Sequence, residues 1–254
     1  MKLTVLGSGT AVPHPKRSSP GFWLETASGT LLLDFGPSAM FRMAQENLDW
    51  PNLDAIWISH FHLDHVGGLA PFLFGVRNAL EIRNRQKPLK VSGPKGLQKL
   101  IENFNTANNY KLFQQPFPLE IIEVEPLEQL EILPSIEAVA LSTPHTDESL
   151  AIHLREGDKT LVYTSDTGFT ETIAAFAKNV DLLVIESSFV KDKPVQKHLE
   201  LAEAMYLIRK AQPKKALLTH LYSEWDSVDF EEEVRKFSHW CEVIEAQDGF
   251  GIGI

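Results

Sequence analysis

Short apolar runs alternate with helical patterns along most of the chain. Residues 2–7 (KLTVLG), 21–26 (GFWLET) and 29–36 (GTLLLDFG) have β-like sequences and are separated by turns rich in Gly, Pro and Ser. Residues 38–47 have helical spacing, and residues 53–59 form a nearly continuous apolar run, typical of a strand that is buried on both faces. This alternation predicts an α/β protein.

The middle of the chain has a different pattern of apolar and polar residues. Residues 65–80 predict a helix, residues 89–93 a strand, and residues 94–105 another helix with Pro94 at its first position. Between residues 119 and 166, five short runs with one polar face each predict a meander of strands. Alternation then resumes, with helices expected at 170–179, 198–212 and 229–240 and strands at 180–188, 214–221 and 241–246.

The order of these elements suggests two sheets with helices outside them. Because the chain has no repeat, low-complexity linker or break in composition, we expect residues 1–254 to form a single domain. The one cysteine, Cys241, excludes an intramolecular disulfide. No apolar run is long enough for a membrane span and no signal segment is evident, so we expect a cytoplasmic protein with no membrane partner.

The net charge of −10 bears on the kind of partner. Proteins that bind long polyanions usually show a basic patch or stripe, and no dense run of Lys and Arg occurs here. The charge therefore argues against a long polyanion such as a nucleic acid as a partner.

A polar cluster follows the apolar run at 53–59 directly. In the segment ISHFHLDHVGG, four potential metal ligands lie within six residues: His60, His62, Asp64 and His65. Loops at the carboxyl ends of strands carry chemistry in α/β proteins, and imidazole and carboxylate are ligands of zinc and related divalent metals. Hydrogen-bonded surface histidines would explain one such residue better than they explain this cluster. The segment therefore predicts a metal site.

Three further ligand-type residues also follow apolar strands. They are His145 in STPHTDES, Asp166 in TSDT and His220 in LLTHL. Each alone is weak, because a single histidine at a strand end can simply cap a backbone group. Together with the first cluster they provide five histidines and two aspartates, which suffices for two metal ions.

The segment SHFHLDH resembles the HxHxDH signature of the metallo-β-lactamase superfamily, and the later His145, Asp166 and His220 follow the ligand order of that superfamily. The segments LTVLGSGTAVPHPKRSSPGFWLE, LLLDFGPS, and KHLELAEA ahead of LLTHL resemble its ribonuclease Z branch. The resemblance implies an α/β fold, the four-layer αβ/βα sandwich, with two metals at the rim between its sheets. It implies zinc, or else manganese or iron, held by two groups of residues that Asp166 bridges: His60, His62 and His145 in one, and Asp64, His65 and His220 in the other.

The resemblance also implies a hydrolase with three catalytic side chains. Asp64 would orient the attacking water or accept its proton, besides acting as a ligand. His198 would donate a proton to the leaving group. Glu186, at the end of an apolar strand, would orient His198 through a hydrogen bond. The alternatives are a water-facing His198 at a helix start and a solvent-facing Glu186.

Three positions depart from the ribonuclease Z pattern. The twenty residues between His145 and Asp166 leave no room for a tRNA-clamping arm, Glu200 stands where a small hydroxylic residue is usual, and Ser38 replaces a glycine. These departures favour a small or cyclic phosphodiester as the substrate. A ribonuclease Z-type tRNA 3′ endonuclease, a lactone or thioester hydrolase, and a binding protein without turnover are the alternatives. A homodimer is left open.

Overall fold

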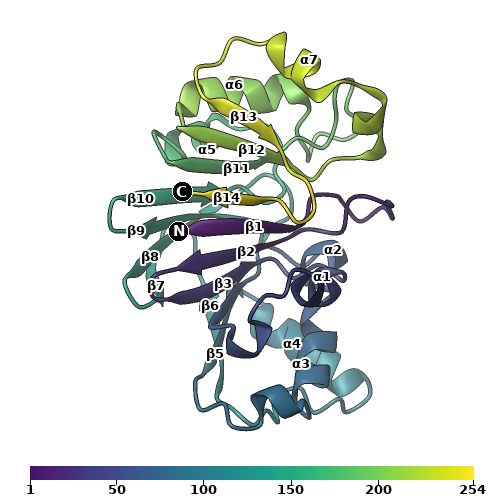
Figure 1. Ribbon diagram of the computed structural model, residues 1–254, viewed down its shortest axis with the longest axis vertical. Helices are drawn as coiled ribbons and strands as arrows, with labels where there is room; N and C mark the ends of the chain where they lie inside the picture. The colour runs from purple at the N-terminus through teal and green to yellow at the C-terminus, as the bar shows by residue number, and fades with distance from the viewer.

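The computed structural model describes all residues from 1 to 254, which form two seven-stranded sheets with helices outside (Figure 1). In spatial order the first sheet contains β14 (Gly251–Gly253), β1 (Lys2–Gly7), β2 (Gly21–Thr26), β3 (Gly29–Leu33), β4 (Ala55–Trp57), β5 (Leu89–Pro94) and β6 (Leu119–Val124). The second contains β13 (Glu242–Glu245), β12 (Lys215–Thr219), β11 (Leu182–Glu186), β10 (Lys159–Tyr163), β9 (Leu150–Glu156), β8 (Ile136–Ser142) and β7 (Gln129–Leu133).

Each sheet is mixed in the same way. In the first sheet β14, β1, β2 and β3 pair antiparallel, and β3 to β6 pair parallel. In the second sheet β7 to β10 pair antiparallel, and β10 to β13 pair parallel. The parallel strands are those that need helical crossovers, which explains why the helices cluster beside these halves of the sheets.

Seven α-helices and three short 3₁₀ helices connect the strands. The α-helices are α1 (Ala39–Gln45), α2 (Leu63–Val66), α3 (Leu69–Val76), α4 (Leu97–Ala107), α5 (Glu171–Phe176), α6 (Leu201–Ala211) and α7 (Phe230–Arg235). The 3₁₀ helices are η1 (Trp50–Asn52), η2 (Leu80–Ile82) and η3 (Ser223–Ser227). In the view of Figure 1, α5 to α7 lie in the upper part and α1 to α4 lie below them. No helix combines the length and apolar character that crossing a bilayer requires.

Three apolar layers hold the sandwich together, and the strands divide their side chains between them. In β3, Leu31 and Leu33 belong to the core between the two sheets, while Leu32 faces the core under α1, α3 and α4. In β11, Val184 faces the inner core and Ile185 the core under α5 and α6. This alternation is the period-2 geometry of a strand covered on both faces. The αβ/βα sandwich implied by the sequence is confirmed.

Four local predictions were wrong. Residues 119–124 are not part of the meander: as β6 they pair parallel with β5 in the first sheet. The helix expected over 65–80 is interrupted at Gly67–Gly68, where a Cβ on Gly68 would lie 2.5 Å from the Gly36 carbonyl oxygen. Pro94 ends β5, and α4 begins only at Leu97 because Gly96, with φ 100°, turns the chain first. The helix expected over 229–240 ends at Arg235.

Candidate metal centre

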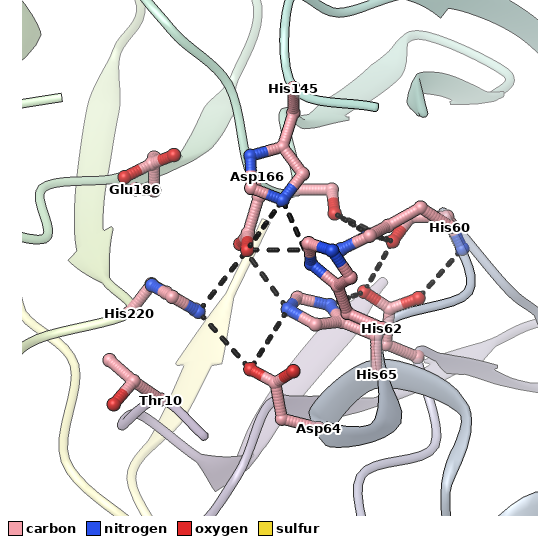
Figure 2. Close-up of polar contacts among 12 residues, drawn as sticks. Thr10, His60, His62, Asp64, His65, His145, Asp166, Glu186 and His220 are labelled. Atoms are coloured by element: carbon pink, nitrogen blue, oxygen red, sulfur yellow. Dashed lines mark hydrogen bonds and ion pairs between the residues drawn. The ribbon is translucent and has the colours of Figure 1, made fainter. Parts of the chain in front are cut away.

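The predicted ligand residues come from loops that follow four different strands. His60, His62, Asp64 and His65 follow β4 and enter the single turn of α2. His145 follows β8, Asp166 follows β10, and His220 follows β12. Since these strands belong to both sheets, the seven side chains meet at the rim between the sheets (Figure 2).

The seven side chains form two groups that share Asp166. In the first group His60, His62 and His145 have ligand atoms close to one another and to Asp166. His145 Nε2 lies 3.0 Å from His62 Nδ1 and 3.6 Å from Asp166 Oδ2, and His60 Nε2 lies 3.8 Å from the same oxygen. Asp166 is therefore the carboxylate of this first group.

The second group lies on the other side of the Asp166 carboxylate. His220 Nε2 is 3.4 Å from Asp166 Oδ2 and 3.5 Å from Asp64 Oδ2. His65 Nε2 is 3.3 Å from Asp166 Oδ1 and 3.5 Å from Asp64 Oδ2. Figure 2 shows Asp64 and Asp166 on opposite sides of the two rings. The structure thus brings together the seven residues that the sequence singled out as ligands.

Four of the histidines have their Nδ1 atom occupied by a protein group. His60 Nδ1 lies 3.0 Å from Ser59 Oγ, and His65 Nδ1 lies 2.7 Å from Asp34 Oδ2. His145 Nδ1 donates to the Lys197 carbonyl at 2.8 Å, and His220 Nδ1 lies 3.0 Å from Ser188 Oγ. Such bonds fix the tautomer and orientation of a metal-binding imidazole and direct Nε2 at the ion. His62, the exposed member, instead turns Nδ1 toward the cluster.

Unsatisfied polar atoms provide the test of whether a metal fits. His60 Nε2, His65 Nε2, His220 Nε2 and Asp166 Oδ1 are buried and make no hydrogen bond. Buried polar atoms are normally paired, because desolvating them without a partner is costly. Imidazole nitrogens and a carboxylate oxygen converging in this way fit a divalent cation of the zinc type. The residues present are therefore suited to binding metal.

The protonation states of His60 and Asp166 agree with a ligand set. Burial, together with the neighbouring His65, lowers the pKa of His60, which keeps this ring neutral. Burial alone would raise the pKa of Asp166, but the surrounding histidines outweigh it and hold that pKa well below its usual range. Neutral imidazoles and ionised carboxylates are the forms that bind metal ions. Burial alone would lower the pKa of His65, but the Asp166 and Asp34 carboxylates outweigh it and raise that pKa, so metal binding would have to release the proton of this ring.

Asp34 is a site residue that the sequence interpretation missed. It follows β3 in the left-handed conformation, with φ 58°, and is fully buried. Its carboxylate accepts hydrogen bonds from Ser59 N at 2.7 Å, Ser59 Oγ at 2.8 Å and the Tyr163 hydroxyl at 2.7 Å, in addition to its contact with His65. Its position after an apolar strand, like that of the ligand residues, was the available signal.

Backbone strain is also present at this rim. Asp34, Ser165 (53°) and His220 (58°), which follow strands at the rim and are not glycine, adopt positive φ. Residues of this kind seldom adopt the left-handed region, and such strain tends to cluster at functional sites. The unusual backbone turns the side chains that follow β3, β10 and β12 toward the cluster.

His198 and Glu186 lie beside the second group. His198 Nδ1 is 3.1 Å from Glu186 Oε1, and its ring stacks on His220 with centroids 5.2 Å apart. Glu186 is buried rather than solvent-facing, and also accepts hydrogen bonds from Thr167 N and Leu199 N. Burial alone would lower the pKa of His198, but the hydrogen bond and charge of Glu186 outweigh it and raise that pKa.

Ser188 joins these two residues to the metal cluster. Its hydroxyl oxygen lies 2.6 Å from Glu186 Oε2, 3.3 Å from His198 Nδ1 and 3.0 Å from His220 Nδ1. Glu186, His198 and His220 could by distance form a third metal-binding group, but the Ser188 hydroxyl already contacts all three. This trio is therefore a hydrogen-bonded support rather than a third metal site.

Comparison with known proteins places the site in context. A family profile described as "Beta-lactamase superfamily domain" matches residues 30–221. The probable metallo-hydrolase YhfI of Bacillus subtilis is 27% identical over 87% of both chains, and its crystal structure superposes with a TM-score of 0.79 over 99% of both chains. Ribonuclease Z of Ignicoccus hospitalis is 25% identical over 88% of this chain and 89% of that enzyme.

A human enzyme has a similar fold. The short form of human tRNase Z has a TM-score of 0.79 and 20% identity, over 100% of this chain and 99% of its own. The alignment with the Ignicoccus ribonuclease Z spans 276 positions although it covers only part of this 254-residue chain. That enzyme therefore has segments without a counterpart here. The alignment with YhfI spans 223 positions, close to the number of residues of this chain that it covers, so it contains almost no such insertions.

Proposed function

This chain belongs to the β-lactamase superfamily and is a metal-dependent hydrolase, and from that premise we propose that it cleaves a small or cyclic phosphodiester with two divalent metal ions. Zinc is the metal we favour, with manganese or iron as alternatives, because histidine nitrogens dominate the ligand set. His60, His62 and His145 would hold one ion, Asp64, His65 and His220 the other, and Asp166 both. When bound, such ions provide Lewis-acid stabilisation of phosphoryl oxygens and promote deprotonation of the attacking water near neutral pH.

Charge supports an anionic substrate at this site. Two divalent ions bring four positive charges, and the ligand set returns two negative charges, from Asp64 and Asp166, when its histidines are neutral. The centre therefore stays positive even though the chain as a whole carries −10. A phosphodiester is attracted to such a local charge without any basic surface patch.

One observation carries the choice of a phosphodiester, and it is the Glu186–His198 pair beside the cluster. Departure of an alkoxide from phosphorus requires a proton, which a positioned imidazolium can donate. The contact between His198 Nδ1 and Glu186 favours the protonated ring and leaves Nε2 as the atom that donates to the leaving oxygen. Asp64 would orient the attacking water or accept its proton.

Two other hydrolytic functions use the same groups. Ribonuclease Z-type cleavage of tRNA is favoured by the names of the relatives, but the His145–Asp166 interval forms only the β9–β10 hairpin and its flanks. Hydrolysis of a thioester would need no proton donor as strong as His198, since a thiolate departs more easily than an alkoxide. A lactone also releases an alkoxide, but it is neutral, and the positive charge of the proposed metal pair favours an anionic phosphodiester over it. The small phosphodiester therefore remains the substrate class we propose.

The test compares these substrates on one metal-loaded preparation. We expect turnover of bis-p-nitrophenyl phosphate and of at least one cyclic phosphodiester, with slower hydrolysis of lactones, thioesters and precursor tRNA. Removal of metal by a chelator should abolish turnover, and added zinc or manganese should restore it. Faster hydrolysis of a lactone or thioester than of every phosphodiester would refute the proposal.

We also propose that residues 1–254 act as one domain. The strand β14, near the C-terminus, pairs with β1 near the N-terminus, and the two chain ends lie close together in Figure 1. Loops from both sheets contribute to the same cluster. Separating the first sheet from the second would therefore divide the proposed ligand set.

A further inference from the structure

The loop that joins β11 to α6, residues 187–200, serves two rings of the site. It carries His198, and its Lys197 carbonyl accepts the hydrogen bond from His145 Nδ1. The rings of His145 and His198 are neighbours, with centroids 4.8 Å apart. The conformation of this loop therefore decides where both imidazoles lie.

The two ends of the loop are held by the backbone. Phe189 and Glu200 form a parallel bridge, in which Phe189 N donates to Leu199 O at 3.2 Å and Leu201 N donates to Phe189 O at 2.8 Å. The middle of the loop, residues 191–197, is exposed except at Lys193. Apart from the Lys197 carbonyl, the hydrogen bonds of this middle part to the rest of the protein are made by Lys193.

Lys193 turns inward between exposed neighbours. Its side chain is 7% exposed, an unusual burial for a lysine in a surface loop. The ammonium donates to the His198 carbonyl at 2.9 Å and to Glu203 Oε2 at 2.7 Å. A buried lysine needs such partners, and its three donors let one ammonium bind a carbonyl and a carboxylate together.

Glu203 connects this lysine to the start of α6. The same Oε2 atom accepts a hydrogen bond from Glu200 N at 3.2 Å, and the Glu200 side chain caps the first turn of the helix in return. The Glu200 carboxylate also lies 3.4 Å from Lys193 N. Glu200, which departs from the usual small hydroxylic residue, is thus part of the same anchor.

We propose that Lys193 is a positioning residue for His198. Its ammonium clamps the His198 backbone to the first turn of α6, so that the imidazole is held between Glu186 and the metal cluster. The proposal rests on the role of His198 as proton donor. Lys193 would not contact the substrate, because its ammonium is directed at Glu203 and at the main chain.

The experiment compares three variants of the full chain. Lys193→Met removes the ammonium but keeps an unbranched side chain, Lys193→Arg keeps the charge, and Lys191→Met removes a charge from an exposed position of the same loop. Three quantities are measured: amide hydrogen exchange of residues 193–199, metal content, and kcat for two phosphodiesters with a good and a poor leaving group. Circular dichroism confirms that each variant is folded.

We expect Lys193→Met to speed hydrogen exchange in this loop and to lower kcat for the poor leaving group by roughly 10-fold, as misplaced catalytic groups do. The loss should be smaller for p-nitrophenolate, and Lys193→Arg should recover part of it. Lys191→Met should match the parent protein. Unchanged exchange in Lys193→Met, or an equal loss with both leaving groups, overturns the proposal.

The closing comparison separates this proposal from the proposed function. If His198→Ala shows a leaving-group dependence and Lys193→Met does not, the positioning role alone is wrong. If His198→Ala shows no such dependence, the proton-donor role fails and the positioning proposal falls with it. Hydrogen exchange tests the anchoring in either case, because it requires no turnover.

Discussion

The hydroxyl of Tyr163 at the end of β10 donates a hydrogen bond of 2.7 Å to Asp34, which follows β3, and so joins the two sheets beneath the metal cluster. Burial and the Asp34 charge raise the pKa of Tyr163, so the phenol stays a donor. The same Asp34 oxygen lies 2.7 Å from His65 Nδ1. One carboxylate therefore links the packing of the sheets to the orientation of a proposed ligand.

The first prediction concerns this link. An amide in place of Asp34 removes a charged acceptor from His65, so Asp34→Asn should lower metal affinity by about 10–100-fold. Tyr163→Phe removes a single donor and should have a smaller effect. Competition with a chromophoric chelator measures both. Parent-like metal affinity in Asp34→Asn would show that His65 keeps its orientation without this carboxylate.

The second prediction concerns metal stoichiometry. Because Asp166 touches both ligand groups, purified protein should hold about two equivalents of metal, and Asp166→Ala should lose much of both. Chelation should also lower the melting temperature, since metal bound to the folded state stabilises it. Elemental analysis and thermal unfolding measure these quantities. A single equivalent that persists in Asp166→Ala would contradict a shared carboxylate.

The third prediction concerns His198. If it protonates the leaving group, His198→Ala should lower kcat by about 10²–10⁴-fold while metal content stays near that of the parent. The loss should shrink for p-nitrophenolate, which departs without a proton. His239→Ala, whose ring instead contacts the Phe237 carbonyl, is the control and should retain full activity. Equal losses for good and poor leaving groups would indicate a role in binding or architecture.

The fourth prediction concerns pH and stability at Asp181, away from the metal cluster. Its carboxylate accepts hydrogen bonds from Thr160 N at 2.8 Å, Thr160 Oγ1 at 3.0 Å and Lys214 Nζ at 2.6 Å. Burial alone would raise the pKa of Asp181, but these donors outweigh it and lower that pKa. The resulting stabilisation is present above the unfolded-state pKa of about 3.9 and is lost as the pH falls through the lower folded-state value.

Asp181→Asn should therefore lower the free energy of unfolding by about 1–3 kcal/mol at pH 7. The difference from the parent protein should narrow as the pH falls below about 4. Urea unfolding across this range measures it, with Asp158→Asn in the neighbouring exposed turn as the control. A difference that is equally large at pH 3 and pH 7 would argue against an ionised Asp181 as the cause.

The cluster of candidate metal ligands was predictable because its residues share one local property. His145, Asp166 and His220 each follow an apolar strand, and the carboxyl ends of strands gather at one rim. The residues that orient these candidate ligands through hydrogen bonds were harder to predict. Asp34 also follows an apolar strand, but it acts through hydrogen bonds to residues far away in sequence, and that position alone does not reveal those partners.

The layers of the fold could be predicted from the sequence, but the strand that each strand pairs with could not. The alternating pattern of β6 suits either sheet, so the sequence could not tell that it pairs with β5 instead of joining the meander. The strand β14 spans only three residues between glycines and is held by its pairing with β1. The break between α2 and α3 depends on how closely Gly68 approaches Gly36, which is a tertiary contact.

The last prediction concerns tRNA, the substrate that the name of several relatives suggests. Phosphate contacts from clustered Lys and Arg dominate affinity for nucleic acid. Here the His145–Asp166 interval contains the strands β9 and β10 joined by a tight turn, and no arm projects from it. The net charge of −10 offers no compensating attraction.

We therefore expect precursor tRNA to be cleaved at least ~100-fold less efficiently, in kcat/KM, than the best small phosphodiester, which corresponds to roughly 2.7 kcal/mol of transition-state stabilisation. A second copy of this chain cannot supply the missing arm, because it lacks that arm at the same place.

A basic stretch that could substitute is residues 77–90, which includes Arg77, Arg83, Arg85, Lys87 and Lys90. Arg85 is already committed to the carbonyls of Pro51, Leu53, Lys87 and Pro88. The measurement is 3′-end maturation of precursor tRNA by the purified, metal-loaded protein at physiological salt. Efficient maturation would overturn the small-substrate proposal, and its loss when Arg77 and Arg83 are changed to Ala would assign tRNA binding to this stretch.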